Sequence, residues 1–360
     1  MSEPMTTDTT QPTSELGRIW DWFADTSCRG YSPLYDRICR EAARDEEVLD
    51  IVRAAPEESH IPNVLLAAVH FLLLNGLDHP LAAVYAGTSE ADPWPLFREI
   101  CFERRPEISA LLETRRTNTN ECGRSAVIGP ALTWVAANVG TPLAVCDVGA
   151  SAGLNMGCDR YLLDYGAAGS TGPASSDVRI SCSVTGGDPP IAPMLPPIAA
   201  RIGLDRSPVD LGIADDAQWL LACTWPDTGR LDRTRAAIRD AQRHPPTIRR
   251  GDMVAGVFDT LAELPNDATI CVLTTWAVAY LSRENRVAFA AELARAGRER
   301  PVVWVSGESP NVVPAFADIV APTVDIEASI LGAVVYDGNR EDATQLAFVH
   351  PHGSWVDWVA

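Results

Sequence analysis

The sequence lacks the features that would place the protein in a membrane or in an oxidising compartment. Its longest apolar stretch, Val64–Leu74, is interrupted by His70 and is shorter than the roughly 20 residues that span a bilayer. None of the nine cysteines forms a Cys-x-x-Cys pair, so we expect reduced, mostly buried thiols. Residues 1–15 have neither a basic start nor an apolar core, which predicts a disordered lead-in rather than a signal peptide. We therefore expect a cytoplasmic protein.

Positive charge is also scarce. The chain has 29 Lys and Arg residues against 48 Asp and Glu, a formal net charge of −19. Nucleic acid is disfavoured as a partner because phosphate binding needs a basic surface. The 360 residues are 46% hydrophobic and 21% charged, which indicates a globular protein with a sizeable core and room for two domains. We expect a small-molecule substrate, with neither nucleic acid nor membrane as partner; the composition leaves the oligomeric state open.

The first part of the chain carries helical signals. Leu16, Ile19, Trp20 and Phe23 follow the i, i+3, i+4, i+7 spacing of one helical face. Further helices are expected to begin at prolines, which suit the first helical turn: Pro33, Pro62, Pro93 and Pro106. Another helix is predicted over Thr117–Asn138. We therefore expect an all-helical N-terminal region over residues 16–140.

From Pro142 onward, strand and helix patterns alternate. The candidate strands are Leu143–Val148, Ala199–Leu204, Thr247–Arg250, Thr269–Thr274 and Val302–Ser306, and the candidate helices are Asp215–Cys223, Leu231–Gln242 and Arg283–Ala296. This alternation predicts an α/β domain over residues 141–360 with a mostly parallel, doubly wound sheet. Ile330–Tyr336 and Gln345–His350 flank an Asp-Gly-Asn turn and predict a closing antiparallel hairpin. The Gly-, Pro- and Ser-rich residues 166–197 predict an insertion loop.

The stretch Leu143–Asn155 carries the most informative motif. An apolar run containing Asp147 leads into a small-residue turn, Gly149–Gly153, and a helical pattern follows. A strand that feeds a glycine turn and a helix presents backbone N–H groups to a ligand. The pattern Asp-x-Gly-x-x-x-Gly resembles the first motif of S-adenosylmethionine-dependent methyltransferases. The pattern Gly-x-Ser-x-Gly also fits the nucleophile elbow of α/β-hydrolases, with Ser151 as the nucleophile.

The methyltransferase interpretation assigns a role to each residue near this turn. Gly149 and Gly153 would let the backbone approach the methionine carboxylate, and Asp147 would face the methionine amino group. Ser151 would lie under the ligand as a donor or spacer. On the following elements, Asn155 would face the ligand, Asp205 would bind the ribose, Asp252 would bind the adenine amine, and Met253 would pack on the adenine ring. Parallel strands that close with a hairpin resemble a Rossmann-like class I methyltransferase sheet, so we expect S-adenosylmethionine as the cofactor.

Two other classes of function stay open. A hydrolase would use Ser151 with Asp252 or Asp325 as the acid and His350 or His352 as the base, in the chain order of α/β-hydrolases. The helical character of the preceding residues and the absence of a His-Gly-Gly loop count against it. A non-catalytic binding protein on the same fold is the third class. A nicotinamide enzyme fits less well because the Gly-x-Gly-x-x-Gly pattern is not met.

The chain also resembles a bacterial family known as domain of unknown function 2332, from about Ser32 to Trp358. The segments that carry the resemblance are Asn63–Leu74, Asp78–Leu81, Thr114–Gly123, Gly149–Tyr165, Gly203–Asp210, Arg250–Asp252 and His350–Gly353. Asn118 stands where we expect the family's Gln. The resemblance supports the fold and implies no reaction.

A polar segment precedes the expected sheet domain. In Thr114–Arg124, Arg116, Asn120 and Arg124 would share one helical face at i, i+4, i+8. The segment is interpreted either as a capped helix start, with Thr117 or Asn118 as N-cap and Glu121 near the capping-box position, or as a polar wall over the cofactor. The second alternative makes Glu121 and Arg116 candidate catalytic residues and Asn120 a candidate substrate contact.

Three residues near the expected strand ends complete the candidates. His352 is a candidate general base because imidazole titrates near neutral pH, although a packed or turn-bonded pair with His350 is the plainer interpretation. No Cys or carboxylate cluster joins these two histidines in the sequence, so we predict no metal. Trp276 and Tyr280 follow the fourth strand and are candidate substrate contacts, or core residues.

Overall fold

The computed structural model describes residues 12, 14–117, 119–322 and 328–360. Residues 1–11 and 13 of the expected lead-in, Asn118, and residues 323–327 with the candidate acid Asp325 lie outside the described residues. The chain divides into two compact units. The helical unit comprises Met1–Thr119 and Ala214–Asp232, and the sheet unit comprises Asn120–Ile213 and Arg233–Ala360. Residues 214–232, which the sequence analysis assigns to the α/β domain, are thus part of the helical unit.

The described elements of the helical unit are helices. They are α1 (Glu15–Phe23), α2 (Pro33–Ala42), α3 (Glu46–Arg53), α4 (Pro62–Leu74), α5 (Leu81–Tyr85), α6 (Pro93–Glu103), α7 (Arg105–Thr114) and α9 (Ala214–Ala222), with short turns of π or 3-10 helix between some of them. Side-chain caps fix several starts: Ser32 accepts a hydrogen bond from Tyr35 N, and Asp45 accepts one from Val48 N. Proline occupies the first turn of α2, α4 and α6, as predicted.

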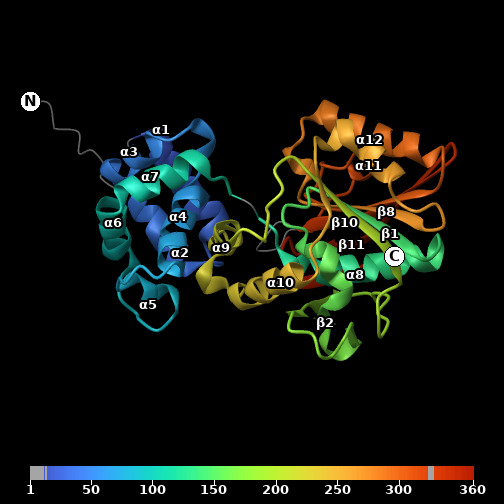
Figure 1. The fold of residues 1–360 in the computed structure, drawn as a ribbon, viewed down its shortest axis with the longest axis horizontal. Coiled ribbons are helices and arrows are strands. Elements are labelled where there is room, and N and C mark those ends of the chain that lie inside the picture. The colour runs from blue at the N-terminus through green and yellow to red at the C-terminus, as the bar shows by residue number, and fades with distance from the viewer. Residues whose placement is uncertain (1–11, 13, 118, 323–327) are drawn as a thin grey trace, which may run out of the picture. The chain divides into compact units, whose positions relative to one another are not determined.

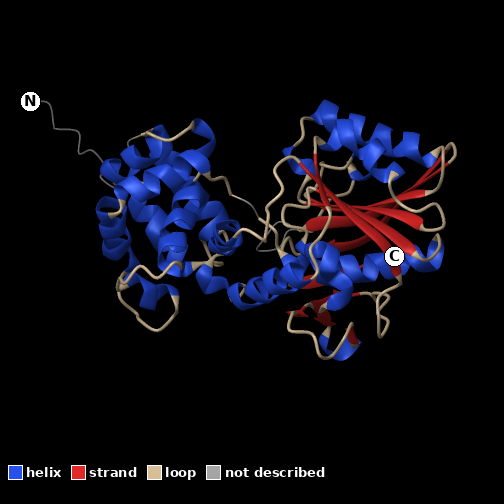
Figure 2. Ribbon diagram, viewed as in Figure 1, coloured by secondary structure: helices blue, strands red, loops and turns tan. Residues whose placement is uncertain are grey.

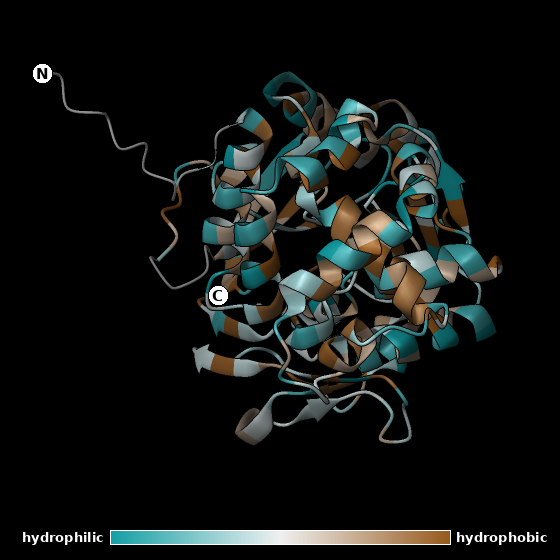
Figure 3. Ribbon diagram, turned by 90° about the vertical axis from the view of Figure 1, so that its left-hand side faces the viewer, coloured by the Kyte–Doolittle hydropathy of each residue, from teal (hydrophilic) through white to brown (hydrophobic). Residues whose placement is uncertain are grey.

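Helix α4 lies in the core of the helical unit and is nearly apolar along its buried length. It packs against α9 and α7, and Trp219 of α9 joins the same hydrophobic cluster. His70, which interrupts the apolar stretch, is buried and hydrogen-bonded through Nδ1 to Ala222 O at 3.0 Å. The helices that face the viewer in Figure 3 carry both hydrophobic and hydrophilic stretches, consistent with one buried and one solvated side. None of the described helices is long and apolar enough to cross a bilayer.

The sheet unit is built on a nine-stranded mixed sheet. Its strands are β1 (Leu143–Val148), β5 (Ser183–Gly186), β6 (Ile198–Asp205), β7 (Ile248–Arg250), β8 (Thr269–Thr275), β9 (Val302–Glu308), β10 (Ser329–Asp337), β11 (Arg340–Val349) and β12 (Trp355–Trp358). Their order is β5-β12-β11-β10-β9-β8-β1-β6-β7. The strands from β7 to β9 are parallel, and β10 is antiparallel to both β9 and β11. The prediction of an α/β fold is confirmed.

Helices cover both faces of this sheet (Figures 1 and 2). Helices α11 (Met253–Ala262) and α12 (Arg283–Gly297) lie on one face, and α8 (Ser125–Asn138) lies on the other. On the α11–α12 side, Phe289 packs edge-on against Trp304 of β9, with ring centroids 5.4 Å apart. The central strands β1, β8 and β9 run as almost continuous buried apolar segments, as expected where a sheet is covered on both sides.

Three local predictions differ from the structure. The helix expected from Thr117 begins only at Ser125, after a turn of 3-10 helix over Cys122–Arg124, so Arg116, Asn120 and Arg124 do not share a helical face. The helix expected after Gly153 is a 3-10 helix, Leu154–Arg160, and the Tyr161 hydroxyl that follows it donates to Leu154 O at its start. The expected 166–197 loop contains β3 (Ser170–Thr171), β4 (Arg179–Ser181) and β5. The first two form a small sheet with β2 (Leu162–Asp164).

Candidate functional site

The candidate site lies at the carboxyl end of β1. After β1 the chain forms β6 and β7 on one side and then returns to form β8 and β9 on the other, so the strand order reverses between β1 and β8. In open α/β sheets, ligands bind outside the carboxyl ends of the strands at such a reversal. Asp147, near the end of β1, is paired with Gly203 of β6 and Leu273 of β8. The glycine turn therefore follows the strand at the point where a ligand crevice is expected.

The turn after β1 needs glycine for two physical reasons. Gly149 has φ +81° and Gly153 has φ +74°, a backbone region that favours glycine. A Cβ on Gly149 would lie 2.5 Å from Ala277 Cβ, and one on Gly153 would lie 2.8 Å from Pro246 Cγ. Ser151 also has a positive φ, +52°. The turn is thus a tight segment packed against the loop after β8.

Most of its N–H groups bond to the protein itself. Gly149 N donates to Leu204 O at 2.8 Å, Gly153 N donates to Ala150 O at 2.7 Å, and Ser151 N donates to Asp205 Oδ2 at 2.8 Å. The next N–H, that of Leu154, donates to Asn120 Oδ1 at 2.9 Å. The donors predicted for a methionine carboxylate are therefore occupied at these four positions.

Two polar side-chain atoms at the turn remain unsatisfied within the described part of the chain. Asp147 is 3% exposed, and its Oδ2 has no hydrogen-bond partner among the described residues. Burial raises the Asp147 pKa to about 7; Asp205 raises it as well, and Arg124 opposes the shift. The hydroxyl of Ser151, also buried, is likewise unpartnered among those residues. Buried polar atoms without partners are rare in folded proteins, which makes this pair the chemically most notable feature of the site.

Arg124 brings positive charge to the same place. It is buried, and it donates through Nε to Pro351 O at 3.0 Å and through Nη1 to Thr275 O, at the end of β8, at 2.8 Å. Its guanidinium opposes the rise that burial causes in the pKa values of both Asp147 and Glu308. Arg116 belongs to the helical unit, where it lies 3.7 Å from the Glu58 carboxylate.

Glu308 is a site residue that the sequence analysis misses. It ends β9, is 1% exposed, and accepts hydrogen bonds from three successive N–H groups, those of Ala277 (2.9 Å), Val278 (3.1 Å) and Ala279 (3.4 Å). Burial raises its pKa, and these N–H groups and Arg124 oppose the shift. The sequence does show a single carboxylate at the end of the apolar run Val302–Glu308. The neighbouring residues do not indicate its hydrogen-bond partners, which lie about 30 residues earlier in the chain.

The two other predicted acidic residues have structural partners. Asp205 accepts hydrogen bonds from Ser151 N and, at 2.7 Å, from Ser207 N, so it ties β6 to the glycine turn. Asp252 is the N-cap of α11, and it lies 3.0 Å from Arg206. The N-cap hydrogen bonds and Arg206 lower the Asp252 pKa. Met253, next in sequence, packs half-buried against the core.

Several further candidates are anchored around the turn. Asn155 is buried and accepts a hydrogen bond from the Ser125 hydroxyl at 3.2 Å. Glu121 Oε1 accepts hydrogen bonds from Gly123 N at 2.7 Å and from Arg233 at 3.0 Å. With Asn120 on Leu154 N, these contacts place the segment that begins at Asn120 beside the glycine turn.

The remaining candidates lie after β8 and β11. Trp276, with φ +55°, donates through its indole to Ser329 Oγ at 2.9 Å, whereas Tyr280 is 86% exposed. His352 N donates to His350 Nδ1 at 3.0 Å, and their rings lie 5.6 Å apart. No group of three or more His, Cys, Asp or Glu side chains is placed to hold a metal in the described ranges.

Among the described residues, the hydrolase candidates do not form a hydrogen-bonded set around Ser151. A serine nucleophile needs a base in hydrogen-bond contact, and Ser151 Oγ has no such partner among the described residues. Asp252 is engaged as a helix cap, and Asp325 lies outside the described residues.

The sheet order defines an α/β protein in which a glycine turn follows β1 at the strand-order reversal. A sequence comparison then gives its family. The family described as "Uncharacterized protein conserved in bacteria (DUF2332)" matches residues 18–358, and the chain belongs to it. No curated protein and no solved structure matches the chain.

Proposed function

We propose that the sheet unit binds S-adenosylmethionine and that the protein transfers its methyl group to a small molecule. In this proposal the sheet is Rossmann-like, of the class I methyltransferase type, and the N-terminal region is an all-helical companion. The observation that carries the proposal is the buried Asp147 carboxylate, with Oδ2 unpartnered among the described residues, at the strand-order reversal.

Several of the residues present fit this cofactor. Asp147 Oδ2 would accept from the methionine ammonium, and the Ser151 hydroxyl would donate to the methionine carboxylate. Asp205 would take the ribose hydroxyls, since each of its oxygens has a lone pair beyond the one its backbone N–H bond uses. The N–H groups of the turn fit this cofactor less well, because they already donate to acceptors of the protein. Side chains would therefore make most of the hydrogen bonds to the cofactor. When bound, the cofactor supplies an electrophilic methyl group.

The chain's own contribution would be mainly to position the reactants. Holding an acceptor in line with the methyl group accounts for a large part of the rate enhancement in such displacements. For an acceptor that must lose a proton, His352 is the proposed base. Glu121, held by Arg233 and Gly123 N, would act as a positioning residue, and Trp276, Tyr280 and Asn120 are the proposed acceptor contacts.

Calorimetric titration of the full chain with S-adenosylmethionine and S-adenosylhomocysteine tests the proposal. We expect binding that weakens at least tenfold in Asp147→Asn and is unchanged in Asp337→Asn, an exposed residue at the end of β10. Because the Asp147 pKa is about 7, affinity should rise as the pH increases through 7 and the carboxylate ionises. Absence of binding to both compounds at millimolar concentration rules the proposal out. Binding without methyl transfer to any metabolite in a cell extract identifies the non-catalytic alternative.

A further inference from the structure

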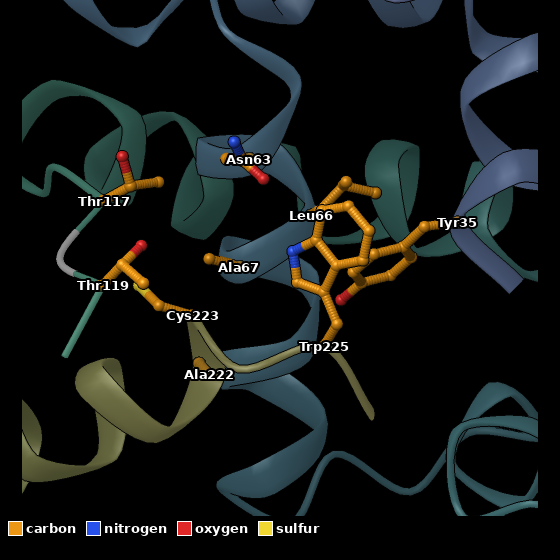
Figure 4. A pocket seen from close by; sticks show the side chains of 9 residues that line it. All are labelled: Tyr35, Asn63, Leu66, Ala67, Thr117, Thr119, Ala222, Cys223 and Trp225. Atoms are coloured by element: carbon orange, nitrogen blue, oxygen red, sulfur yellow. The ribbon is translucent and has the colours of Figure 1, made fainter. Parts of the chain in front are cut away.

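A second candidate site lies within the helical unit. A partly enclosed cavity of about 30 Å³ is bounded by residues of α2, α4 and the segments next to α7 and α9. Its lining residues are Tyr35, Asn63, Leu66, Ala67, Thr117, Thr119, Ala222, Cys223 and Trp225, shown in Figure 4. Tyr35, Leu66, Ala67 and Ala222 are buried and form the floor, whereas the other five are more exposed.

The floor contains a buried polar group that the protein leaves unsatisfied. Tyr35 is 1% exposed, and its hydroxyl has no hydrogen-bond partner among the described residues. The neighbouring Tyr85 hydroxyl is close enough to raise the Tyr35 pKa, after burial, but the two hydroxyls do not reach hydrogen-bond geometry. In Figure 4 the Tyr35 ring extends from α2 toward Ala67 and Ala222, with its hydroxyl end innermost. The phenol therefore stays protonated and available as a donor.

The lining excludes a charged ligand. None of its nine residues is Asp, Glu, Lys, Arg or His. A charged ligand would therefore contact no ionised side chain in the cavity wall, and burying a charge without a paired group is costly. The polar groups are three hydroxyls, one carboxamide, one thiol and the indole N–H of Trp225, while Leu66 and the rest of the Trp225 ring supply apolar walls. The matching chemistry is a neutral group that both donates and accepts hydrogen bonds.

The size of the cavity limits this group to a few heavy atoms. About 15 Å³ of such volume holds one water molecule, so 30 Å³ admits two waters or a planar group such as a carboxamide. We propose that the helical unit binds a neutral carboxamide in this cavity, with the amide donating and accepting hydrogen bonds between the Tyr35 hydroxyl and Asn63. The amide is either a free small molecule or the end of a larger one that continues past Trp225 at the rim. This site does not depend on the proposed function of the sheet unit.

Cys223 provides a direct probe of the cavity. It is the half-buried member of nine cysteines, and the other eight are buried. We would follow its reaction with methyl methanethiosulfonate by intact mass in the full chain, with Cys223→Ser to confirm the site. We expect 200 mM acetamide to slow the reaction at least threefold and sodium acetate, equal in size but charged, to leave it unchanged. Benzamide that protects at tenfold lower concentration would identify the end of a larger molecule as the natural ligand.

Matched variants separate the site from nonspecific effects. Tyr35→Phe and Asn63→Ala should lose the protection by acetamide, whereas Tyr85→Phe and Asn75→Ala, whose side chains do not line the cavity, should keep it. Tyr35→Phe should melt at the same temperature as the parent or higher, because it removes an unsatisfied buried hydroxyl. Equal protection by acetamide and acetate, no protection by acetamide, or full protection in Tyr35→Phe overturns the proposal and leaves a water-filled cavity.

Discussion

Glu308 Oε1 accepts a hydrogen bond from the backbone N–H of Ala277 at 2.9 Å, and the Ala277 methyl group lies against Gly149. The end of β9 thus holds the loop after β8 in place over the glycine turn. This contact links the segments that follow β1 and β8 to the end of β9.

We predict that Glu308→Ala destabilises the protein by on the order of 3 kcal/mol, because it leaves the N–H groups of Ala277 and Val278 without an acceptor. Glu308→Gln retains one acceptor oxygen and should cost about 1 kcal/mol. Urea unfolding measures both, with the exposed Glu341→Ala as the control. Equal losses for the Ala and Gln variants would contradict the assigned role of the carboxyl oxygen.

Gly149 tests the packing of the turn directly. Gly149→Ala combines an unfavourable φ with a Cβ 2.5 Å from Ala277 Cβ, so it should cost about 3 kcal/mol. Gly338→Ala has a similar φ, +63°, with nothing near its Cβ, so it should cost only about 1 kcal/mol.

The double variant Gly149→Ala with Ala277→Gly separates the two effects. Removing the Ala277 methyl group relieves the steric clash but leaves the unfavourable φ. The double variant should therefore be nearly as stable as Gly338→Ala, which has the unfavourable φ alone. Additive losses in urea unfolding would show that Ala277 is not the group that requires glycine at position 149.

The pH dependence of stability should report Asp147. Its folded pKa, about 7, lies above the ordinary 3.8, so the folded state binds the proton more tightly than the unfolded state does. The contribution of this proton to the free energy of unfolding is fully present below pH 4 and is lost as the pH rises toward 7. At 1.36 kcal/mol per pKa unit, the loss amounts to about 4 kcal/mol.

The measurement compares the unfolding free energy of the parent and Asp147→Asn between pH 4 and pH 8. The Asn variant should lack this loss and be the more stable of the two at pH 8, while Asp337→Asn should follow the parent. Parallel pH profiles for the parent and Asp147→Asn would mean that the Asp147 carboxyl titrates normally.

The hydrolase alternative requires Ser151 to react as a nucleophile, whereas the methyltransferase proposal does not. Since Ser151 Oγ has no hydrogen-bonded base among the described residues, we expect no labelling by a fluorophosphonate probe. Mass spectrometry of the treated protein provides the readout, with a known serine hydrolase as the positive control. Labelling of the parent that disappears in Ser151→Ala would support the hydrolase instead.

The strands were predictable because their signals are local. Val302–Glu308 and Thr269–Thr275 are apolar runs bounded by polar residues, and the Asp-Gly turn at Asp337 indicates a hairpin. The start of α8 was not predictable in the same way. Residues 117–124 have helical spacing, but Asn120 and Arg124 bond to Leu154, Pro351 and Thr275, which are distant in sequence.

The candidate site was predictable in position and less so in composition. The Asp147–Gly153 pattern located it, because strand, glycine turn and acidic residue are neighbours in sequence. Asp205 and Asp252 both accept hydrogen bonds from backbone N–H groups, which nearly every residue type offers, so sequence could not distinguish a capping carboxylate from a ligand-binding one. Glu308 was missed because its partners follow a different strand.

The helical unit is made of two stretches of chain, and the second of these, Ala214–Asp232, lies between parts of the sheet unit. The end of that stretch falls inside one helix, α10 (Leu231–Arg243). A gene cut once at position 120 would therefore yield a sheet unit that still carries α9, with Trp219 deprived of the hydrophobic cluster that it joins in the helical unit. A single cut therefore separates the two units at no position in the chain. This interleaving agrees with a family whose match, residues 18–358, runs across both units.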